Sequence, residues 1–268
     1  MTMPKDLVLV RHGESMGNVA TAMSKKGDGS LVRLMRHLHN WQYRLSPRGR
    51  EQAAVAGAWL RGEFPAGFDA YYASPFVRPR ETAGLLALPN ANWRLELRLV
   101  EREWGQMSSM TPSERENRFA SEMERRMRDG MLWAPPGGES ILQTAQRVQR
   151  FVDTMAREFT GRSVVVVCHG DIMWAFRVVL ERLTLERFTE LDDSANLLNR
   201  INNCQILHYT RTDPESGQMA DHLNWMRSVC PTDLTLSSNV WTPVVRPTFS
   251  NEQLLAGIAG YKTFHDDM

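Results

Sequence analysis

The sequence predicts an α/β protein built around a central, mostly parallel sheet, and three observations support that class. Short apolar runs recur along the chain and segments with helical spacing follow them, so strands alternate with helices. The unbroken valine run at residues 164–167 is typical of a central strand that is covered on both faces. The runs at 7–10 and 164–167 both lead into a His-Gly pair, which brings two polar strand ends to one sheet edge if the strands are parallel neighbours.

Each predicted strand is a short run of apolar or β-favouring residues. The first, at residues 7–10, leads directly into Arg11 and His12. Residues 94–100 alternate apolar and charged side chains, which predicts a half-exposed strand near a sheet edge. The predicted strands are residues 7–10, 69–73, 94–100, 164–167, 204–209 and 222–227.

Most of the predicted helices begin at a capping residue. Ser46 and Pro47 supply an N-cap and a first helical residue, while Thr111 and Ser140 begin capping boxes. Apolar residues then recur at helical spacing, most clearly after Ser140. The predicted helices start at residue 46 and then cover about 76–86, 111–128, 140–159 and 171–183.

Length and composition predict one globular domain over all 268 residues. The expected departures from a plain α/β domain are insertions at about 21–45 and 107–136 and a C-terminal extension at about 229–268. The net charge of +1 gives no reason to expect nucleic acid or a membrane as partner. The three cysteines form neither a disulfide framework nor a zinc pattern, so a reducing, cytoplasmic location is expected.

The predicted strand ends deliver charged and titratable side chains to one place. These are Arg11, His12, Arg78, Glu101 and His169. Two histidines suit a metal ion, but two arginines beside them would repel a divalent cation. The same guanidinium groups bind phosphoryl or carboxylate oxygens through paired donors. We therefore expect an anion site that needs no metal and no cofactor.

Six short motifs follow one another along the chain. They are Arg11-His12-Gly13-Glu14-Ser15 with Asn18, Leu45-Ser46-Pro47-x-Gly49-x-x-Gln52-Ala53, Ser74-Pro75-x-x-Arg78-x-x-x-Thr82-Ala83, Leu99-x-Glu101-x-x-x-Gly105, Gly138-Glu139-Ser140 and His169-Gly170. In this order they resemble the histidine phosphatase superfamily, whose fold is that of the cofactor-dependent phosphoglycerate mutases. The resemblance spans about residues 5–210 and implies a three-layer α/β/α sandwich.

The resemblance also implies roles for the site residues. His12 would attack phosphorus and become a phosphohistidine, and Glu101 would act as general acid and then general base. The residues expected around the phosphoryl oxygens are Arg11, Arg78 and His169, with Asn18 and the backbone of Gly170 as additional donors. The expected substrate is a small phosphomonoester.

Three functions stay open at this stage. The first is a metal-independent phosphatase, and the second is a phosphoglycerate-type mutase that uses the same site. The sequence departs from the mutase pattern at Ser15-Met16-Gly17-Asn18, which lacks a tryptophan before the asparagine, and after the acid motif at Gln106-Met107-Ser108-Ser109. The third is a non-catalytic binding protein on the same fold, although every core motif residue is present. The sequence indicates neither the physiological substrate nor the oligomeric state.

Two further expectations concern residues near these motifs. Glu103 lies two residues after Glu101 and is the alternative candidate for the acid. The segment from Thr21 to Leu45 carries five basic residues and one acid, so it either attracts substrates with more than one negative group or forms a solvated basic face.

Overall fold

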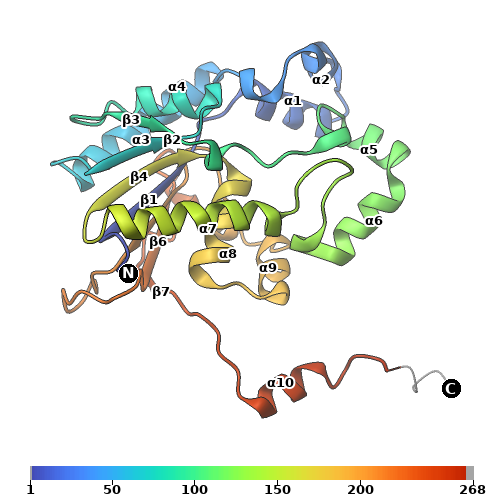
Figure 1. The fold of residues 1–268 in the computed structure, drawn as a ribbon. Coiled ribbons are helices and arrows are strands. Elements are labelled where there is room, and N and C mark those ends of the chain that lie inside the picture. The colour runs from blue at the N-terminus through green and yellow to red at the C-terminus, as the bar shows by residue number, and fades with distance from the viewer. Residues whose placement is uncertain (1, 264–268) are drawn as a thin grey trace.

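The computed structural model describes residues 2–263, and a seven-stranded sheet runs through this part of the chain (Figure 1). The strands lie in the order β3-β2-β4-β1-β5-β6-β7. Their bounds are β1 Asp6–Arg11, β2 Ala70–Ala73, β3 Trp93–Leu95, β4 Ser163–Cys168, β5 Ile206–Thr210, β6 Trp225–Val229 and β7 Thr242–Pro243. The strands β1 to β4 are parallel, and β5 to β7 extend the sheet in antiparallel pairs. The predicted α/β class is confirmed.

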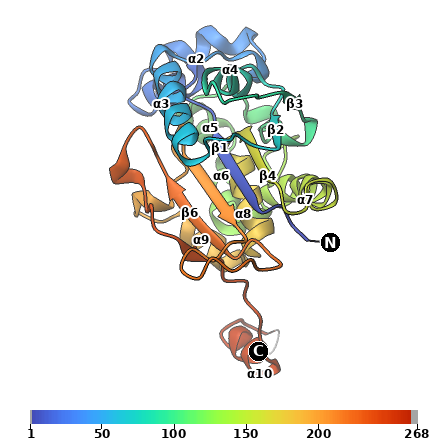
Figure 2. The same ribbon diagram turned by 90° about the vertical axis from the view of Figure 1, so that its left-hand side faces the viewer.

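Helices cover both faces of this sheet (Figure 2). The four covering helices are α3 Pro47–Glu63, α4 Val77–Leu85, α7 Ile141–Glu158 and α8 Gly170–Glu181. Successive residues of β1 point to opposite faces, so Val8 and Val10 pack with α3 and α4, whereas Leu7 and Leu9 pack with α7 and α8. All four side chains are fully buried, which explains why β1 reads as a continuous apolar run.

The register of β1 and β4 positions the chemistry of the site. Val10 lies opposite Val167 and Arg11 lies opposite Cys168. His12 and His169 therefore leave adjacent strands at the same level, as the parallel pairing predicts. In open α/β sheets this carboxyl edge is where ligands bind.

Two pairs of helices stand on the side of the sheet where β1 ends (Figure 1). The first pair is α1 Met16–Lys25 and α2 Ser30–Leu34, and the second is α5 Pro112–Arg118 and α6 Ala120–Asp129. The two segments contact each other, because Arg36 forms an ion pair with Glu114 and donates to the carbonyl of Ser109. We call residues 16–45 the first roof segment and residues 108–129 the second, because together they lie over the carboxyl edge of the sheet.

The remaining elements are short. They are the helices α9 Leu185–Asp192 and α10 Asn251–Ile258 and the 3-10 turns η1 Met35–His37, η2 Asn40–Gln42, η3 Leu97–Leu99, η4 Gly105–Met107, η5 Gly130–Leu132, η6 Leu197–Asn199 and η7 Leu234–Leu236. The arrangement as one domain with two insertions stays a prediction.

The structure corrects two of the predicted elements. The strand expected at 94–100 ends at Leu95, because the Glu96 side chain accepts from the Arg98 backbone N–H and begins a 3-10 turn. The helix expected at 111–128 divides into α5 and α6 at Phe119, whose φ of −139° leaves the helical region. The last two predicted strands begin two to three residues later than expected.

The C-terminal segment divides into two parts. Its first part adds β7 to the edge of the sheet, and Arg246 then donates hydrogen bonds to the carbonyls of Leu180 and Leu223. Beyond this anchor α10 lies away from the sheet and its covering helices (Figures 1 and 2). In residues 2–263 the structure contains no helix with the length and apolar character that crossing a membrane requires.

Candidate active site

A cavity of about 290 Å³ opens at the carboxyl edge of the sheet. Its walls come from the end of β1, the first turns of α4 and α8, the chain between η3 and α5, and the two roof segments. The polar and aromatic residues of its lining include Arg11, His12, Asn18, Asn40, Arg78, Glu101, Trp104, Arg115 and Asp171. The predicted residues Arg11, His12, Arg78, Glu101 and Asn18 therefore meet around one space.

His12 is held in one orientation at the floor of this cavity. Its Nδ1 lies 2.7 Å from the carbonyl oxygen of Gly13, which accepts and so places the proton on Nδ1. The other nitrogen, Nε2, accepts from Arg78 Nε at 3.0 Å. Burial, together with the positive charges of Arg78 and Arg11, holds the pKa of His12 well below its ordinary value. The ring is therefore neutral at neutral pH, with its lone pair on Nε2.

Two buried arginines surround the histidine. Arg78 stands in the first turn of α4, where Nη1 donates to the backbone carbonyl and to Oδ1 of Asn40 at 2.8 and 2.9 Å. Burial lowers its pKa to about 10, so it stays charged. Arg11 donates through Nη1 to the carbonyl of Ile201 at 2.6 Å, while its buried Nε has no hydrogen-bond partner in residues 2–263. An unpartnered buried N–H beside the cavity favours an anionic ligand.

His169 supports the site from behind. Its ring centroid is 5.2 Å from that of His12, and its Nε2 lies 2.9 Å from the Ser74 hydroxyl. The Ser74 oxygen also accepts from the backbone N–H of Phe76, so its hydroxyl proton is free to be donated to Nε2. The proton of His169 then belongs on Nδ1, which has no hydrogen-bond partner in residues 2–263. Burial first, and then the charge of Arg78, holds its pKa well below the ordinary value.

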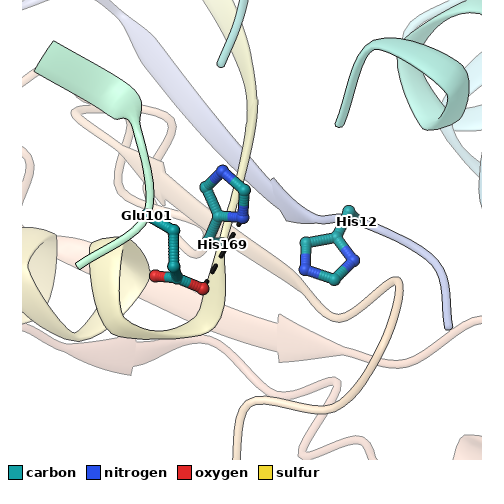
Figure 3. Close-up of side chains that lie close together, drawn as sticks. All are labelled: His12, Glu101 and His169. Atoms are coloured by element: carbon teal, nitrogen blue, oxygen red, sulfur yellow. Dashed lines mark ion pairs between the residues drawn. The ribbon is translucent and has the colours of Figure 1, made fainter. Parts of the chain in front are cut away.

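Glu101 is the carboxylate of the cluster (Figure 3). Its Oε2 lies 3.6 Å from His169 Nδ1 and 3.7 Å from Arg78 Nη2, and its side chain is 17% exposed. Burial first, and then the negative charge of Asp171, raises its pKa to about 7. Glu101 therefore holds a proton over much of the neutral pH range, as a general acid must. The alternative, Glu103, instead accepts from the backbone N–H of Gly105 outside this cluster.

The ligand atoms of His12, Glu101 and His169 lie within 4.8 Å of one another, close enough to hold a metal ion. Arg78 stands between them, since it contacts both the Nε2 of His12 and Glu101. A fixed positive charge at that point opposes a divalent cation and favours an anion. The donor set thus fits a phosphoryl group better than a metal.

The two additional donors proposed from sequence have different surroundings. Asn18 lines the cavity, and its Oδ1 accepts from the Ser15 backbone and from Asn203, which leaves its amide nitrogen as the end that faces a ligand. Gly170 begins α8 beside the Arg11 side chain, and neither it nor His169 lines the cavity wall.

The basic segment from Thr21 to Leu45 lines the cavity in part, but not with its charges. Thr21, Val32 and Asn40 reach the wall. Its five basic side chains do not, because two form outer ion pairs and the others are exposed. They are Arg36 with Glu114, Arg44 with Glu81, and Lys25, Lys26 and Arg33. These charges therefore lie on a solvated face outside the cavity wall. The alternative, that they attract substrates with more than one negative group, stays a prediction.

Three residues at the site carry no signal of their own in the sequence. Asn40 and Arg115 lie inside the roof segments, where only the folded contacts identify them. Asp171 reads as a helix-start residue, yet it lines the cavity and pairs with Arg102 at 3.3 Å. The sequence signal for Asp171 is its position as a charged residue directly after His169-Gly170.

Comparisons with known proteins agree with this geometry. A 2,3-bisphosphoglycerate-dependent phosphoglycerate mutase from Methylobacterium radiotolerans is 31% identical to this chain over 195 residues, which cover 70% of this chain and 85% of that protein. A mycobacterial glucosyl-3-phosphoglycerate phosphatase, solved in complex with VO3, is 25% identical with a TM-score of 0.60, and the match covers 76% of this chain and 90% of that chain. The alpha-ribazole phosphatase of Shigella flexneri shares the fold at 18% identity and a TM-score of 0.60, over 81% of this chain and 96% of that chain.

A model of the histidine phosphatase superfamily, branch 1, matches residues 7–205, a range that contains each of the six motifs. The relatives named above include both a mutase and phosphatases, so the comparisons agree on the family and differ on the reaction. The motif order, the paired strand ends and this match lead to one conclusion: the chain belongs to the histidine phosphatase superfamily.

Proposed function

We propose that this protein is a metal-independent phosphatase that hydrolyses a small phosphomonoester through a phosphohistidine on His12. The observation that carries the proposal is the pairing of a neutral, oriented His12 with a Glu101 whose pKa is about 7. A nucleophile must be deprotonated and a general acid protonated at the same pH, and the two environments provide both states.

In the first step, His12 Nε2 attacks phosphorus while the bond from phosphorus to the ester oxygen breaks. Glu101 gives its proton to that oxygen, so the leaving group departs as an alcohol. In the structure Arg78 Nε donates to His12 Nε2 at 3.0 Å. Once Nε2 bonds to phosphorus, this N–H donates its hydrogen bond to a phosphoryl oxygen instead. Arg11 Nε and His169 Nδ1, both without hydrogen-bond partners in residues 2–263, supply further donors for the charge on those oxygens.

In the second step, water attacks the phosphohistidine and the bond from phosphorus to Nε2 breaks. Glu101, now ionised, accepts a proton from the water and returns to its starting state. Inorganic phosphate leaves, and His12 is again neutral. The reaction consumes one water and needs no other reactant.

A mutase is the second candidate, and the named relative from Methylobacterium radiotolerans favours it. A mutase would return the phosphoryl group to the substrate instead of to water. The same His12, Arg11, Arg78 and Glu101 serve both reactions, so the choice depends on whether water reaches the phosphohistidine.

An assay of phosphomonoesters with and without a chelator tests the proposal. We expect release of inorganic phosphate at equal rates with and without chelator. A parallel assay supplies 3-phosphoglycerate together with 2,3-bisphosphoglycerate and follows the formation of 2-phosphoglycerate. Isomerisation much faster than phosphate release would replace the phosphatase by the mutase, and loss of phosphate release on chelation would contradict the metal-independent mechanism.

A further inference from the structure

Arg115 places a third guanidinium group on the cavity wall, away from the His12 floor. It lies in α5, which a capping box between Thr111 and Glu114 begins. Glu114 also forms an ion pair with Arg36 of the first roof segment, so α5 is tied to that segment. The Arg115 guanidinium stacks on the Trp104 ring, with its Cζ 4.7 Å from the ring centroid. The side chain is therefore pre-positioned toward the space that Trp104 also lines.

No acid in residues 2–263 forms an ion pair with Arg115. Its Nε is buried and has no hydrogen-bond partner there. The two other arginines on Trp104, Arg102 and Arg126, line a separate small cavity that contains Asp171 and Asp192. Those two arginines thus have carboxylates near them, whereas burial and then the positive charge of Arg126 lower the pKa of Arg115. A partly buried cation without a partner at a ligand cavity indicates an anionic ligand group.

The other charges of the cavity do not compensate Arg115. Glu101 Oε2 lies 3.7 Å from Arg78 Nη2, and Asp171 Oδ2 pairs with Arg102 Nε at 3.3 Å. The basic residues of the first roof segment form their ion pairs on the outside. The cavity therefore has two centres of positive charge, one around His12 and one at Arg115.

We infer that Arg115 binds a second anionic group, a carboxylate or a phosphate, on the leaving group of the substrate. This inference rests on the proposed phosphatase reaction, which places the transferred phosphoryl group at His12. The substrate class is then a phosphomonoester whose alcohol carries a negative charge. The planar Arg115 fork fits either oxyanion by two parallel hydrogen bonds, and Trp104 supports the guanidinium from its other face.

A three-carbon series of substrates tests the inference. Glycerol 3-phosphate carries only the transferred phosphate, 3-phosphoglycerate adds a carboxylate, and glycerol 1,3-bisphosphate adds a second phosphate. In the wild type we expect kcat/KM to be higher for at least one of the two doubly charged substrates than for glycerol 3-phosphate. In Arg115→Met the ratio should fall roughly ten- to a hundredfold, as for loss of a charge-assisted bidentate contact. The substrate with the larger fall identifies the anion.

Two variants control for folding and for general charge. Arg125→Met removes an arginine of the neighbouring helix α6 that pairs with Glu122 and Asp129 and does not line the cavity, so it should keep the wild-type ratio. Arg115→Lys retains the charge and should recover part of the preference. Thermal unfolding of each variant shows that the comparison is made on folded protein.

Binding measurements separate this inference from the proposed reaction. Calorimetry in the His12→Ala background compares the affinities for 3-phosphoglycerate, glycerol 1,3-bisphosphate and glycerol 3-phosphate without turnover. If no phosphomonoester is hydrolysed but the affinity ratio still depends on Arg115, the proposed reaction fails and the second-anion site stands. Equal ratios in wild type and Arg115→Met, by kinetics and by binding, would overturn the second-anion site. No preference of the wild type for either doubly charged substrate would overturn it as well.

Discussion

At the scale of single residues, the proposed reaction depends on the protonation states of His12 and Glu101. Burial and two nearby cations keep His12 neutral, whereas burial and Asp171 keep a proton on Glu101 near pH 7. Both shifts have the same first cause, the removal of water from around the ring and the carboxyl group. Neutral forms of both groups are what attack on phosphorus with protonation of the leaving oxygen requires.

The pH dependence of the reaction follows from the pKa of Glu101. Only the protonated acid donates to the leaving oxygen, so kcat/KM for an alkyl phosphate should fall above about pH 7 and approach tenfold per pH unit. His12 is already neutral well below pH 6.5, so its protonation should limit the rate only at lower pH. A pH profile of kcat/KM measures both limbs.

Matched substitutions identify the group behind the alkaline limb. Glu101→Gln should abolish the limb, whereas Glu103→Gln should keep it, because Glu103 caps Gly105 outside the cluster. Asp171→Asn should move the limb to lower pH, because it removes a negative charge that raises the pKa of Glu101. A limb that disappears in Glu103→Gln and survives in Glu101→Gln would reverse the assignment.

The ranking of the losses in kcat among substitutions distinguishes covalent catalysis from acid catalysis. Glu101→Gln should lower kcat by roughly 10² to 10⁴, the usual contribution of a general acid. His12→Ala and Arg11→Met should each lower it further, because they remove the nucleophile and a donor to the developing charge. Steady-state kinetics on a single alkyl phosphate gives the ranking, and a larger loss in Glu101→Gln than in His12→Ala would contradict it.

At the scale of elements, α3 closely approaches the turn after β1. A Cβ on Gly49 would collide with the backbone of Glu14, and one on Gly13 would collide with the carbonyl of Gly49. This approach presses the start of α3 against the turn that carries His12. Residues without a side chain are thus needed at Gly13 and Gly49 to keep His12 in its position.

Two alanine substitutions in α3 test this packing. Gly49→Ala should destabilise the protein by about 1–3 kcal/mol, as overpacking against backbone does, and should also lower kcat by displacing His12. Gly62→Ala meets nothing within 4 Å and should stabilise it by about 0.5–1 kcal/mol. Chemical denaturation of both variants gives the comparison, and equal stabilities would show that the approach is not tight.

The elements that could be predicted from sequence are those whose pattern does not depend on distant contacts. The apolar runs of β1 and β4 are buried on both faces, and α7 begins with a capping box before a long apolar stripe. The end of β3 could not be predicted, because Leu95, Leu97 and Leu99 alternate as in a strand while the Glu96 side chain turns the backbone. The roles of Asn40 and Arg115 were equally hidden, since they arise only where the two roof segments meet.

At the scale of the whole molecule, the chain beyond Arg246 is separate from the parts that hold the site. Arg246 ties this segment to the body through hydrogen bonds to Leu180, Leu223 and Asn224. The cavity wall contains no residue from this extension. The structure places the first part of this extension on the sheet edge and α10 apart from it (Figure 1).

Truncation and substitution at this boundary should therefore differ. A chain that ends at Pro247 should keep the wild-type Tm and kcat, because α10 does not contribute to the core clusters or the cavity. Arg246→Ala should lower stability by about 1–3 kcal/mol, since it leaves buried carbonyl groups without a donor. Thermal unfolding and phosphatase assays on both proteins test the prediction, and a lower Tm of the truncated chain would show that α10 packs on the body.

The family could be predicted from sequence because its motifs are short and local, at the ends of β1 and β4 and at the starts of α3 and α7. The substrate could not, because the residues that face it lie in the roof segments, whose charges pair with each other in ways that only the folded chain reveals. Arg36 and Arg115 illustrate the difference: both are basic residues of a roof segment, yet only Arg115 faces the cavity.

The central claim is that His12 carries the phosphoryl group during turnover. Rapid acid-free quenching of the protein with a ³²P-labelled phosphomonoester, followed by peptide mapping, tests it most directly. The account predicts acid-labile, base-stable label on the peptide that contains His12, formed and lost fast enough to support kcat and absent in His12→Ala. Turnover at the wild-type rate in His12→Ala, or label that maps to another residue, would contradict it.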